Sequence, residues 1–196
     1  MSNTLIFDTE TTGICNFKSI DHTVQPYPVQ LAMELFNDEK LIHSASIIIN
    51  PGVPVPEPAY KVHGISTEVA ELYGIQLRAA AGLFINFILK ADRLVGHNID
   101  FDLIVMEAAI YRSELNFDLA KFRQIPRVCT MKSTTNLLKL SGKYGYKWPT
   151  LEEAYKHLVS PDGFSGAHDA MSDVRATKAV LSAIEKMDID LKSGDR

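Results

Sequence analysis

The chain has 196 residues, 46% of them hydrophobic, and a formal net charge of −4. This length suits a single domain with its own hydrophobic core. The N-terminus has no signal-peptide pattern and no apolar run is long enough to span a bilayer, so we expect a cytoplasmic protein with no membrane partner. The two cysteines, Cys15 and Cys129, fit no metal-ligand spacing and are expected to be free thiols.

The first half of the sequence predicts strands. Residues 4–8 form a buried run bounded by a Thr-Thr-Gly turn, and a polar loop with prolines follows at 14–28. Two further strands are expected at 29–36 and 41–49, and residues 37–40 between them form a hairpin loop. This hairpin predicts antiparallel pairing.

The second half predicts helices that alternate with short strands. After an extended, proline-rich stretch at 51–58, Ser66 is placed to cap a short helix that ends near Gly74. Short strands are expected at 94–96 and 128–130. The hydrophobic patterns predict further helices at 77–90, 101–112, 131–140, 151–158 and 170–186.

This order of elements predicts an α/β layered domain with a mixed sheet, because the hairpin strands pair antiparallel and the helix-linked strands run parallel. We expect the domain to cover residues 1–187 and residues 188–196 to form a disordered tail. No internal repeat divides the chain.

Two carboxylates, Asp8 and Glu10, stand two residues apart at the end of the first strand. Because side chains alternate along a strand, both should point to the same face. Adjacent carboxylates repel one another, and a bound Mg²⁺ or Mn²⁺ would remove this repulsion. Gly13 lets the backbone turn tightly and leaves room for a substrate. The alternative is that the carboxylates only cap the Thr-Thr-Gly turn.

Two later stretches add two more carboxylates and a histidine. Asp100 and Asp102 fall in the first turn of a helix, where a carboxylate also serves as a cap, and spacing alone does not choose between them. His168 and Asp173 flank another helix start, with Asp169 as the expected N-cap. A histidine there can take a proton from a water molecule, although a lone histidine is more often structural.

A basic stretch runs from Leu119 to Leu151 and contains no Asp or Glu. The net charge of −4 therefore divides into +7 in this stretch and −11 elsewhere. Its cations, with the aromatic residues interleaved among them, are Lys121, Phe122, Arg123, Arg127, Lys132, Lys139, Lys143, Tyr144, Tyr146, Lys147 and Trp148. Cations for phosphates and aromatic faces for bases suit single-stranded nucleic acid, and the alternative is a solvated basic face with core aromatics.

The three carboxylate stretches together resemble the motifs of the DEDDh branch of the DnaQ-like 3′→5′ exonucleases. The first family motif, D-x-E-T-T-G, matches residues 8–13. The second, G-H-N-x-x-F-D, matches residues 96–102 and decides for Asp102. The third, H-x(4)-D, matches His168 and Asp173.

The resemblance implies a ribonuclease H-like fold with a central five-stranded mixed sheet flanked by helices. It also implies metal-dependent release of 5′-mononucleotides from 3′ ends. The implied catalytic residues are Asp8, Glu10, Asp102, His168 and Asp173, and the four carboxylates would hold two Mg²⁺ ions, with Mn²⁺ as a substitute. With the basic stretch, the expected substrate-binding residues are Thr11, Thr12, Gly13, His63, Asn98, Lys143 and Lys147.

The leading hypothesis is a 3′→5′ exonuclease of bacterial or phage origin that acts on single-stranded DNA or frayed 3′ ends, with His168 as general base. An enzyme that trims RNA or oligoribonucleotides would use the same residues. A polymerase-associated proofreading subunit is less favoured, because the chain ends 23 residues after Asp173. A non-catalytic nucleic-acid-binding module would have lost a catalytic position. The expected partner is nucleic acid, with a polymerase or a second copy of the chain as alternatives.

Overall fold

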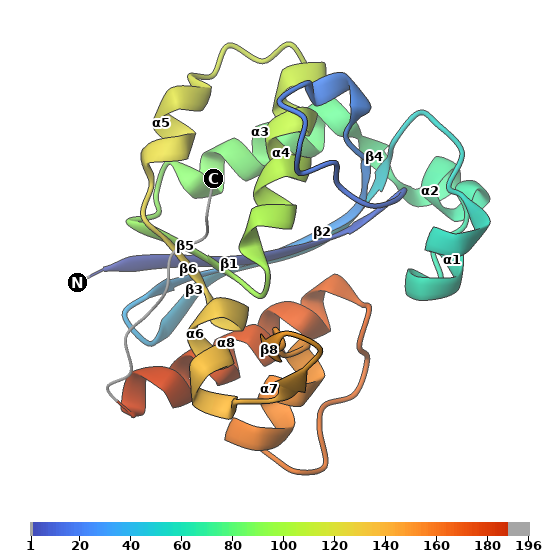
Figure 1. Cartoon of the computed structure of the whole chain (residues 1–196). Coiled ribbons are helices and arrows are strands. Elements are labelled where there is room, and N and C mark those ends of the chain that lie inside the picture. Colours follow the sequence, from blue (N-terminus) through green and yellow to red (C-terminus); the bar gives the residue numbers. More distant parts are fainter. Residues whose placement is uncertain (1, 188–196) are drawn as a thin grey trace.

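In the computed structural model, residues 2–187 form a twisted sheet between two layers of helices (Figure 1). The tail expected at 188–196 lies outside the described residues. Among residues 2–187, no helix has both the length and the apolarity needed to cross a bilayer. Cys15 and Cys129 are free thiols, as predicted, and both are buried.

The central sheet has six strands in the order β4-β3-β2-β1-β5-β6. They are β1 (Asn3–Thr11), β2 (Pro28–Asn37), β3 (Lys40–Asn50), β4 (Ile75–Gln76), β5 (Arg93–Gly96) and β6 (Arg127–Cys129). Strands β1, β2 and β3 pair antiparallel, whereas β5 runs parallel to both β1 and β6, and β4 runs parallel to β3. The predicted α/β class with a mixed sheet is confirmed. The two-residue strand β4 at the edge raises the strand number from the expected five to six.

Helices cover both faces of this sheet. They are α1 (Glu57–His63), α2 (Thr67–Tyr73), α3 (Leu77–Ile88), α4 (Ile99–Arg112), α5 (Leu119–Gln124), α6 (Thr130–Leu138), α7 (Leu151–Leu158) and α8 (Ala170–Lys186). Figure 1 shows α3, α4 and α5 above the sheet, α6, α7 and α8 below it, and α1 with α2 beyond one end. A short 3₁₀ helix at His22–Val24 lies in the loop between β1 and β2.

The proline-rich stretch predicted to be extended is instead helical from Glu57 onward. Pro56 has an extended backbone at the N-cap, and Pro58 stands in the first turn of α1, where its missing N–H has no helical partner to lose. These prolines therefore start a helix. Helix α5 and a small hairpin, β7 (Ser141–Gly142) and β8 (Gly145–Tyr146), were also not predicted, because such short elements show little periodicity.

Hydrophobic contacts hold β1 from both faces. On the side of α3, the ring of Phe84 lies 5.0 Å from that of Phe7 and 5.8 Å from that of Phe122, between centroids. On the opposite side, Ile6 packs in a cluster with Val174 of α8. Odd and even residues of β1 thus face different helix layers, as the alternation of a strand requires. Burial on both faces fixes the register of this strand, which carries the first motif.

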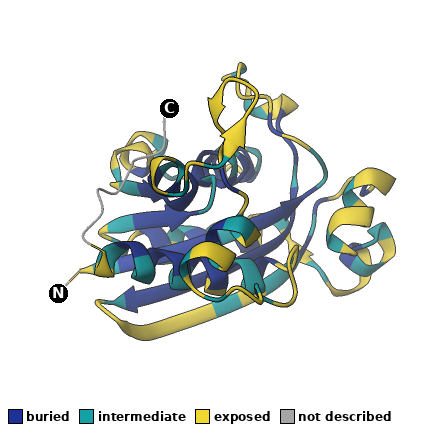
Figure 2. Ribbon diagram, turned by 60° about the horizontal axis from the view of Figure 1, so that its bottom comes forward, coloured by how far each residue is buried: buried dark blue, intermediate teal, exposed yellow. Residues whose placement is uncertain are grey.

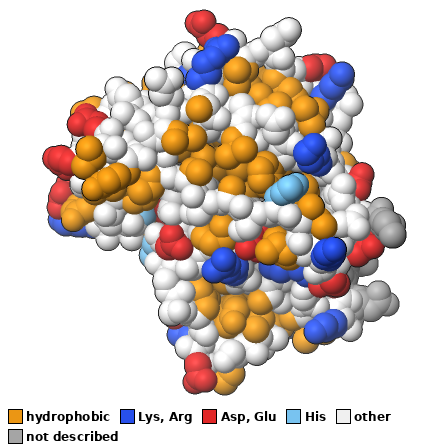
Figure 3. All heavy atoms as spheres, turned by 180° about the vertical axis from the view of Figure 1, so that it is seen from behind, with side chains coloured by type: hydrophobic (Ala, Val, Ile, Leu, Met, Phe, Trp, Pro, Cys, Tyr) orange, Lys and Arg blue, Asp and Glu red, His pale blue; other side chains and the backbone are white. Residues whose placement is uncertain are grey.

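The outer strand β3 keeps most of its edge open. It pairs with β4 only at Ile49 and Asn50, and Leu41 and Ile42 beyond that pairing are about two-fifths exposed. Figure 2 shows this strand in yellow along the lower edge of the sheet. Figure 3, seen from behind, shows hydrophobic side chains gathered in the middle of this side of the molecule. An open edge of this kind can accept another strand.

Candidate active site

The first two carboxylates stand on β1, which continues past its expected end at Asp8 to Thr11. Asp8 and Glu10 share the strand face of Ile6, which is the face that α8 covers. The pairing of β1 with β2 shifts register between Glu10 and Thr11. A bulge of this kind bends a strand and re-aims its side chains, and here it lies directly beside the carboxylates.

The second motif opens at the same end of the sheet because β5 runs parallel to β1. Gly96 ends β5, and a Cβ at this position would lie 3.1 Å from the Cβ of Ile99, so a larger residue would crowd the turn into α4. Asn98 begins α4 with a left-handed φ of 66° and makes no side-chain cap bond. The turn thus brings the start of α4 to the edge of the sheet.

The side chain of His97 holds this turn through two hydrogen bonds. Its Nε2 lies 3.0 Å from the carbonyl oxygen of Pro149, and its Nδ1 lies 2.9 Å from the hydroxyl of Thr130. Because a carbonyl only accepts, Nε2 carries the proton and Nδ1 accepts from the hydroxyl. Burial lowers the pKa of His97 to about 4, so the ring is neutral near pH 7. His97 is therefore a structural link between the turn and the segment before α7.

The contacts of Asp102 and Asp100 separate these two candidates. Asp102 Oδ1 accepts from the backbone N–H of Thr9 at 2.9 Å and from its hydroxyl at 2.7 Å. Asp100 instead pairs with Lys132 of α6 at 3.0 Å. Asp102 therefore lies against β1, next to the two carboxylates of that strand, and reaches them from the α4 side of the sheet.

The third motif lies where α8 begins. Asp169 is its N-cap, as predicted, and accepts from a backbone N–H in the first turn. Gln30 of β2 donates to Asp169 Oδ1 at 2.9 Å and accepts from the N–H of Ala170 at 3.2 Å. This double contact ties the start of α8 to the sheet, so that Asp173 in its first turn meets the end of β1.

His168 stands just before this cap, exposed and in the left-handed region with a φ of 67°. Its backbone N–H donates to Asp173 Oδ2 at 3.3 Å. Its imidazole and the carboxylates of Glu10 and Asp173 offer ligand atoms that all lie within 4.8 Å of one another. The structure thus brings the predicted histidine to the solvent side of the carboxylates.

Burial, and after it the repulsion between neighbouring carboxylates, raises the pKa values of the site. Burial raises the pKa of Asp8 well above its usual range, and the charges of Asp102, Asp173 and Glu10 raise it further. Burial followed by the charges of Asp173 and Asp102 raises the pKa of Glu10 to about 8. Burial raises the pKa of Asp102 to about 7, against the hydrogen bonds from Thr9 that lower it. Burial also raises the pKa of Asp173.

This donor set fits a divalent cation. Carboxylate oxygens are the ligands that Mg²⁺ and Mn²⁺ prefer, and a cation held among them would supply the positive charge that the raised pKa values show to be lacking. The ligands come from β1, α4 and α8, so the folded chain assembles them from three distant parts of the sequence.

A pocket of about 560 Å³ opens beside Glu10. This volume is typical of small-molecule sites. Its walls include Phe101 of α4, Val62 of α1 and Ile14 after β1. The predicted substrate-binding residues that line it are Thr11, Thr12, Gly13 and His63.

His63 joins α1 to the end of β1. Its Nδ1 accepts from the N–H of Ile65 at 3.1 Å, so Nε2 carries the proton and donates to the carbonyl of Thr11 at 3.3 Å. Burial lowers the pKa of His63. This histidine is thus both part of a turn and part of the pocket wall.

The residues after β1 contribute differently from the sequence-based expectation. Thr12 donates its N–H to the carbonyl of Tyr27 at 2.9 Å, and its hydroxyl accepts from the N–H of Tyr27 at 3.0 Å, so its polar groups hold the loop. The backbone bends at Thr12 and Gly13, as expected, but without a left-handed residue. Gly13 is not in the left-handed region and a Cβ there would meet no atom within 4 Å, so it simply borders the open pocket.

The basic stretch divides between core and surface. Phe122 is buried, which agrees with the alternative that the aromatic residues belong to the core. Tyr144 and Trp148 are exposed. Lys143 and Lys147 both lie on the hairpin of β7 and β8 or directly after it, and Lys147 pairs with Glu153 at 2.5 Å.

Sequence reasoning missed residues that support the site. Thr9 and Gln30 hold Asp102 and the α8 start, and Phe101 lines the pocket. An indication for Thr9 was present in the sequence, because this residue stands between two carboxylates and must therefore face the opposite side of the strand. No sequence pattern indicated a role for Gln30, because its hydrogen-bond partner Asp169 lies 139 residues away.

Comparison with known proteins places this chain in a family. Residues 5–181 match the RNase T exonucleases, and the chain belongs to this family. The uncharacterized exonuclease CP81 of Escherichia phage 186 is 29% identical over 198 residues, which cover 93% of this chain and 88% of that protein. The DNA polymerase III subunit epsilon of Pasteurella multocida is 31% identical over 115 residues, which cover 58% of this chain and 44% of that subunit. The predicted DnaQ-like exonuclease family is thereby confirmed.

Solved structures share the fold. Exonuclease I of E. coli in complex with a dT13 oligonucleotide superposes with a TM-score of 0.76 at 22% identity, over 94% of this chain and 41% of that one. The zinc-bound form of the exonuclease I–single-stranded DNA complex gives a TM-score of 0.74 at 23% identity, over 95% of this chain and 41% of that one. The chain therefore spans about two-fifths of exonuclease I. The predicted ribonuclease H-like fold is confirmed by this likeness.

The raised pKa values predict how stability depends on pH without metal. The pKa of Glu10 rises from 4.5 to about 8 on folding, so unfolding releases protons between these values. The free energy of unfolding in EDTA should therefore fall as the pH rises from 5 to 8, and Glu10→Gln should flatten this slope. Urea denaturation at several pH values measures the effect, with the exposed Glu71→Gln as matched control. A wild-type slope that Glu10→Gln leaves unchanged would contradict the electrostatic account.

Divalent ions should stabilise the wild type through the same site. At a metal concentration of about 100 times Kd, binding adds about 2.7 kcal/mol, which corresponds to roughly 5–10 °C in Tm for a chain of this size. Asp8→Asn should respond far less to Mg²⁺ or Mn²⁺, and it should be more stable than the wild type in EDTA at pH 8, because it removes a repelling charge. Asp162→Asn, in an exposed loop, is the control. Equal shifts in both variants would place the bound metal elsewhere.

Proposed function

We propose that this member of the RNase T family is a metal-dependent 3′→5′ exonuclease that releases 5′-mononucleotides from single-stranded or frayed DNA. The observation that carries the proposal is the convergence of Asp8, Glu10, Asp102 and Asp173, with His168 beside them, at the end of β1. These groups come from three distant segments and repel one another. A cluster of this kind is fully ionised at neutral pH only with cations bound, and phosphodiester hydrolysis is a chemistry that such cations support.

The four carboxylates would hold two Mg²⁺ ions, which Mn²⁺ could replace. When bound, such ions supply charge for the scissile phosphate and lower the pKa of the attacking water. His168 would take the proton from that water, because an imidazole exchanges protons readily near neutral pH. Its exposed position, within 4.8 Å of the ligand atoms of Glu10 and Asp173, lets it pass the proton on to solvent.

The pocket beside Glu10 would receive the terminal nucleotide. Phe101, Val62 and Ile14 offer apolar surface to a base or sugar, and the neutral His63 closes one wall. Thr11, Thr12 and Gly13 would border the sugar and phosphate, with Asn98 at the start of α4 as a further contact. This arrangement supports attack at a chain end, because the pocket would receive a nucleotide directly beside the acidic cluster.

The relatives support DNA as the substrate. The exonuclease I structures contain DNA oligonucleotides, and the epsilon subunit belongs to a DNA polymerase. An enzyme that trims RNA would use the same five residues, and so this alternative is decided by experiment. The match to the epsilon subunit also keeps association with a polymerase among the proposed partners. A second copy of the chain stays a predicted partner, for which the open edge of β3 offers a surface.

The polarity of cleavage tests the proposed function. Single-stranded DNA and RNA oligonucleotides of matched sequence, labelled at either end, are incubated with Mg²⁺, Mn²⁺ or EDTA. We expect a metal-dependent ladder that shortens the 5′-labelled strand and an early release of mononucleotide from the 3′-labelled one. Asp8→Asn should be inactive under all conditions. Cleavage inside the strand, or shortening from the 5′ end, would refute the proposed activity, and faster cleavage of RNA would favour the trimming alternative.

The role of His168 is tested separately. We expect His168→Ala to retain the metal-dependent rise in Tm but to lose about 10²–10⁴-fold in kcat, which is the usual contribution of a general base. His157→Ala, on the exposed side of α7, serves as the control. A His168→Ala variant with near-normal turnover would remove this residue from the proposed mechanism.

A further inference from the structure

The small hairpin of β7 and β8 projects from the body of the molecule. Every residue from Ser141 to Trp148 is exposed, and the hairpin stands out in yellow at the top of Figure 2. Tyr144, Tyr146 and Trp148 are 91%, 53% and 64% exposed. Three large rings on eight consecutive residues add little to folding, since a buried ring contributes far more than an exposed one.

Positive charge accompanies these rings. Lys143 Nζ lies 5.1 Å from the centroid of the Tyr144 ring. Lys147 directly follows β8 and pairs with Glu153. The hairpin belongs to the stretch without Asp or Glu in a chain whose net charge is otherwise negative. The residues from Gly142 to Trp148 surround a hollow of about 270 Å³. Rings and cations around a shallow hollow match the bases and phosphates of an unpaired strand.

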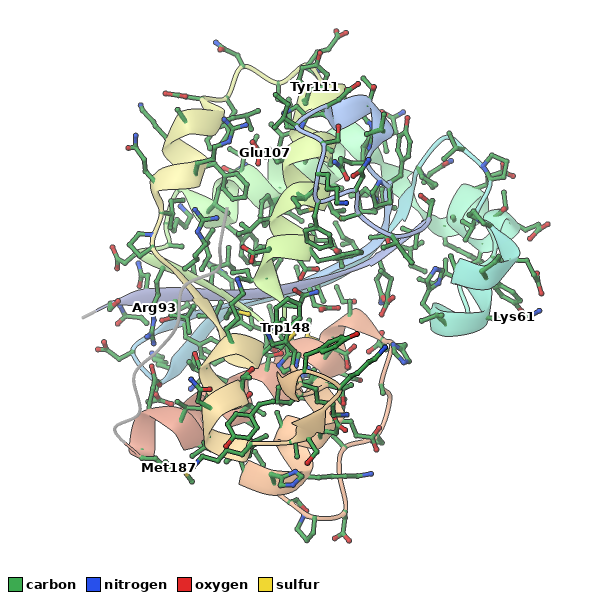
Figure 4. All side chains as sticks on the ribbon, viewed as in Figure 1. Lys61, Arg93, Glu107, Tyr111, Trp148 and Met187 are labelled. Carbon is green, nitrogen blue, oxygen red and sulfur yellow. The ribbon has the colours of Figure 1, made fainter. Side chains whose placement is uncertain are left out.

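Hydrogen bonds fix the base of the hairpin beside the proposed active site. The N–H of Lys147 donates to the carbonyl of Leu140 at 2.9 Å, and the carbonyl of Pro149, next to Trp148, accepts from His97 at 3.0 Å. His97 belongs to the turn that begins α4. Trp148, labelled in Figure 4, lies in front of the region between the sheet and the lower helices in that view, on the hairpin that Figure 2 shows projecting from the body. The residue that follows the hairpin segment is thus hydrogen-bonded to the turn that delivers Asp102.

We propose that the segment from Ser141 to Trp148 is a stacking platform for the unpaired bases that precede the cleaved 3′ end. The inference rests on the proposed function and names the contact that would select single strands. Tyr144 and Trp148 stack on bases, and Lys143 contacts the phosphates. Paired bases present no free faces, so a blunt duplex gains nothing from the platform.

The fluorescence of Trp148 can be used to test its contact with the strand, because it is the one tryptophan of the chain. The full-length protein is titrated in EDTA with a long oligothymidylate, and Trp148 emission is followed together with the anisotropy of a labelled strand. We expect saturable quenching that tracks the anisotropy, and no quenching by a blunt duplex. Emission that stays unchanged while the strand binds would overturn the proposal, and so would absence of strand binding or equal quenching by the duplex.

Substitutions separate the platform from the catalytic centre. Tyr144→Ala and Trp148→Ala should each raise Kd for the long strand by at least about 5-fold, and kcat/KM should fall by a similar factor. Hydrolysis of the p-nitrophenyl ester of thymidine 5′-monophosphate, which has no preceding bases, should not change. Tyr111→Ala is the matched control, because Tyr111 is 55% exposed at the far end of α4 (Figure 4). Unaltered Kd in both hairpin variants would refute the platform.

The two proposals fail in distinguishable ways. If the wild type binds and quenches in EDTA but cleaves neither substrate with metal, the platform stands and the exonuclease proposal falls. If the ester and the strand are cleaved equally well by the wild type and the hairpin variants, the exonuclease proposal stands and the platform falls. Lys143→Gln adds a third measure, since the loss of one phosphate contact should reduce the salt slope of strand binding by about 0.7.

Discussion

The crowding of four carboxylates in a poorly solvated place is the constraint on which the rest of the structure depends. Burial raises the pKa of Asp8, Glu10, Asp102 and Asp173 at the end of β1, and the charges of other members of this group raise it further for the first three. A site of this kind opposes folding unless cations are bound, so the rest of the structure must hold it together. The hydrophobic clusters on the two faces of β1 do this, because they fix the strand from which the first two carboxylates project.

Polar residues behind the site then determine its geometry. Thr9 points away from the carboxylates of its own strand and holds Asp102 on the opposite face, while Gln30 ties the N-cap of α8 to the sheet. His97 joins the turn before α4 to the segment before α7. Each contact links segments that lie far apart in the sequence. The four carboxylates meet because three secondary-structure elements are fixed by these links, and no local sequence preference could bring them together.

The sequence predicted those features of the site that depend on local periodicity. Asp8 and Glu10 share a face because a strand alternates, and the caps of α2 and α8 follow from Ser66 and Asp169. The choice between the two aspartates of α4 needed either the family motif or the structure, since it depends on which one reaches Thr9. Prolines misled the prediction at 51–58, because a proline in the first turn of a helix looks the same in sequence as one in an extended chain. Burial of Phe122, but not of Trp148, depends on tertiary packing that spacing does not contain.

The separation of charge along the chain solves a problem that any nuclease of this kind faces. An acidic site attracts metal ions and, without them, repels a polyanionic strand, so affinity for the strand must come from elsewhere on the surface. The cations and rings between Ser141 and Trp148 lie on a hairpin anchored to the same turn that positions Asp102. Stacking of bases is insensitive to the charge of the site, whereas binding of the scissile phosphate requires its neutralisation. Strand capture and chemistry can therefore depend on different parts of one small domain, which the hydrogen bond between His97 and Pro149 connects.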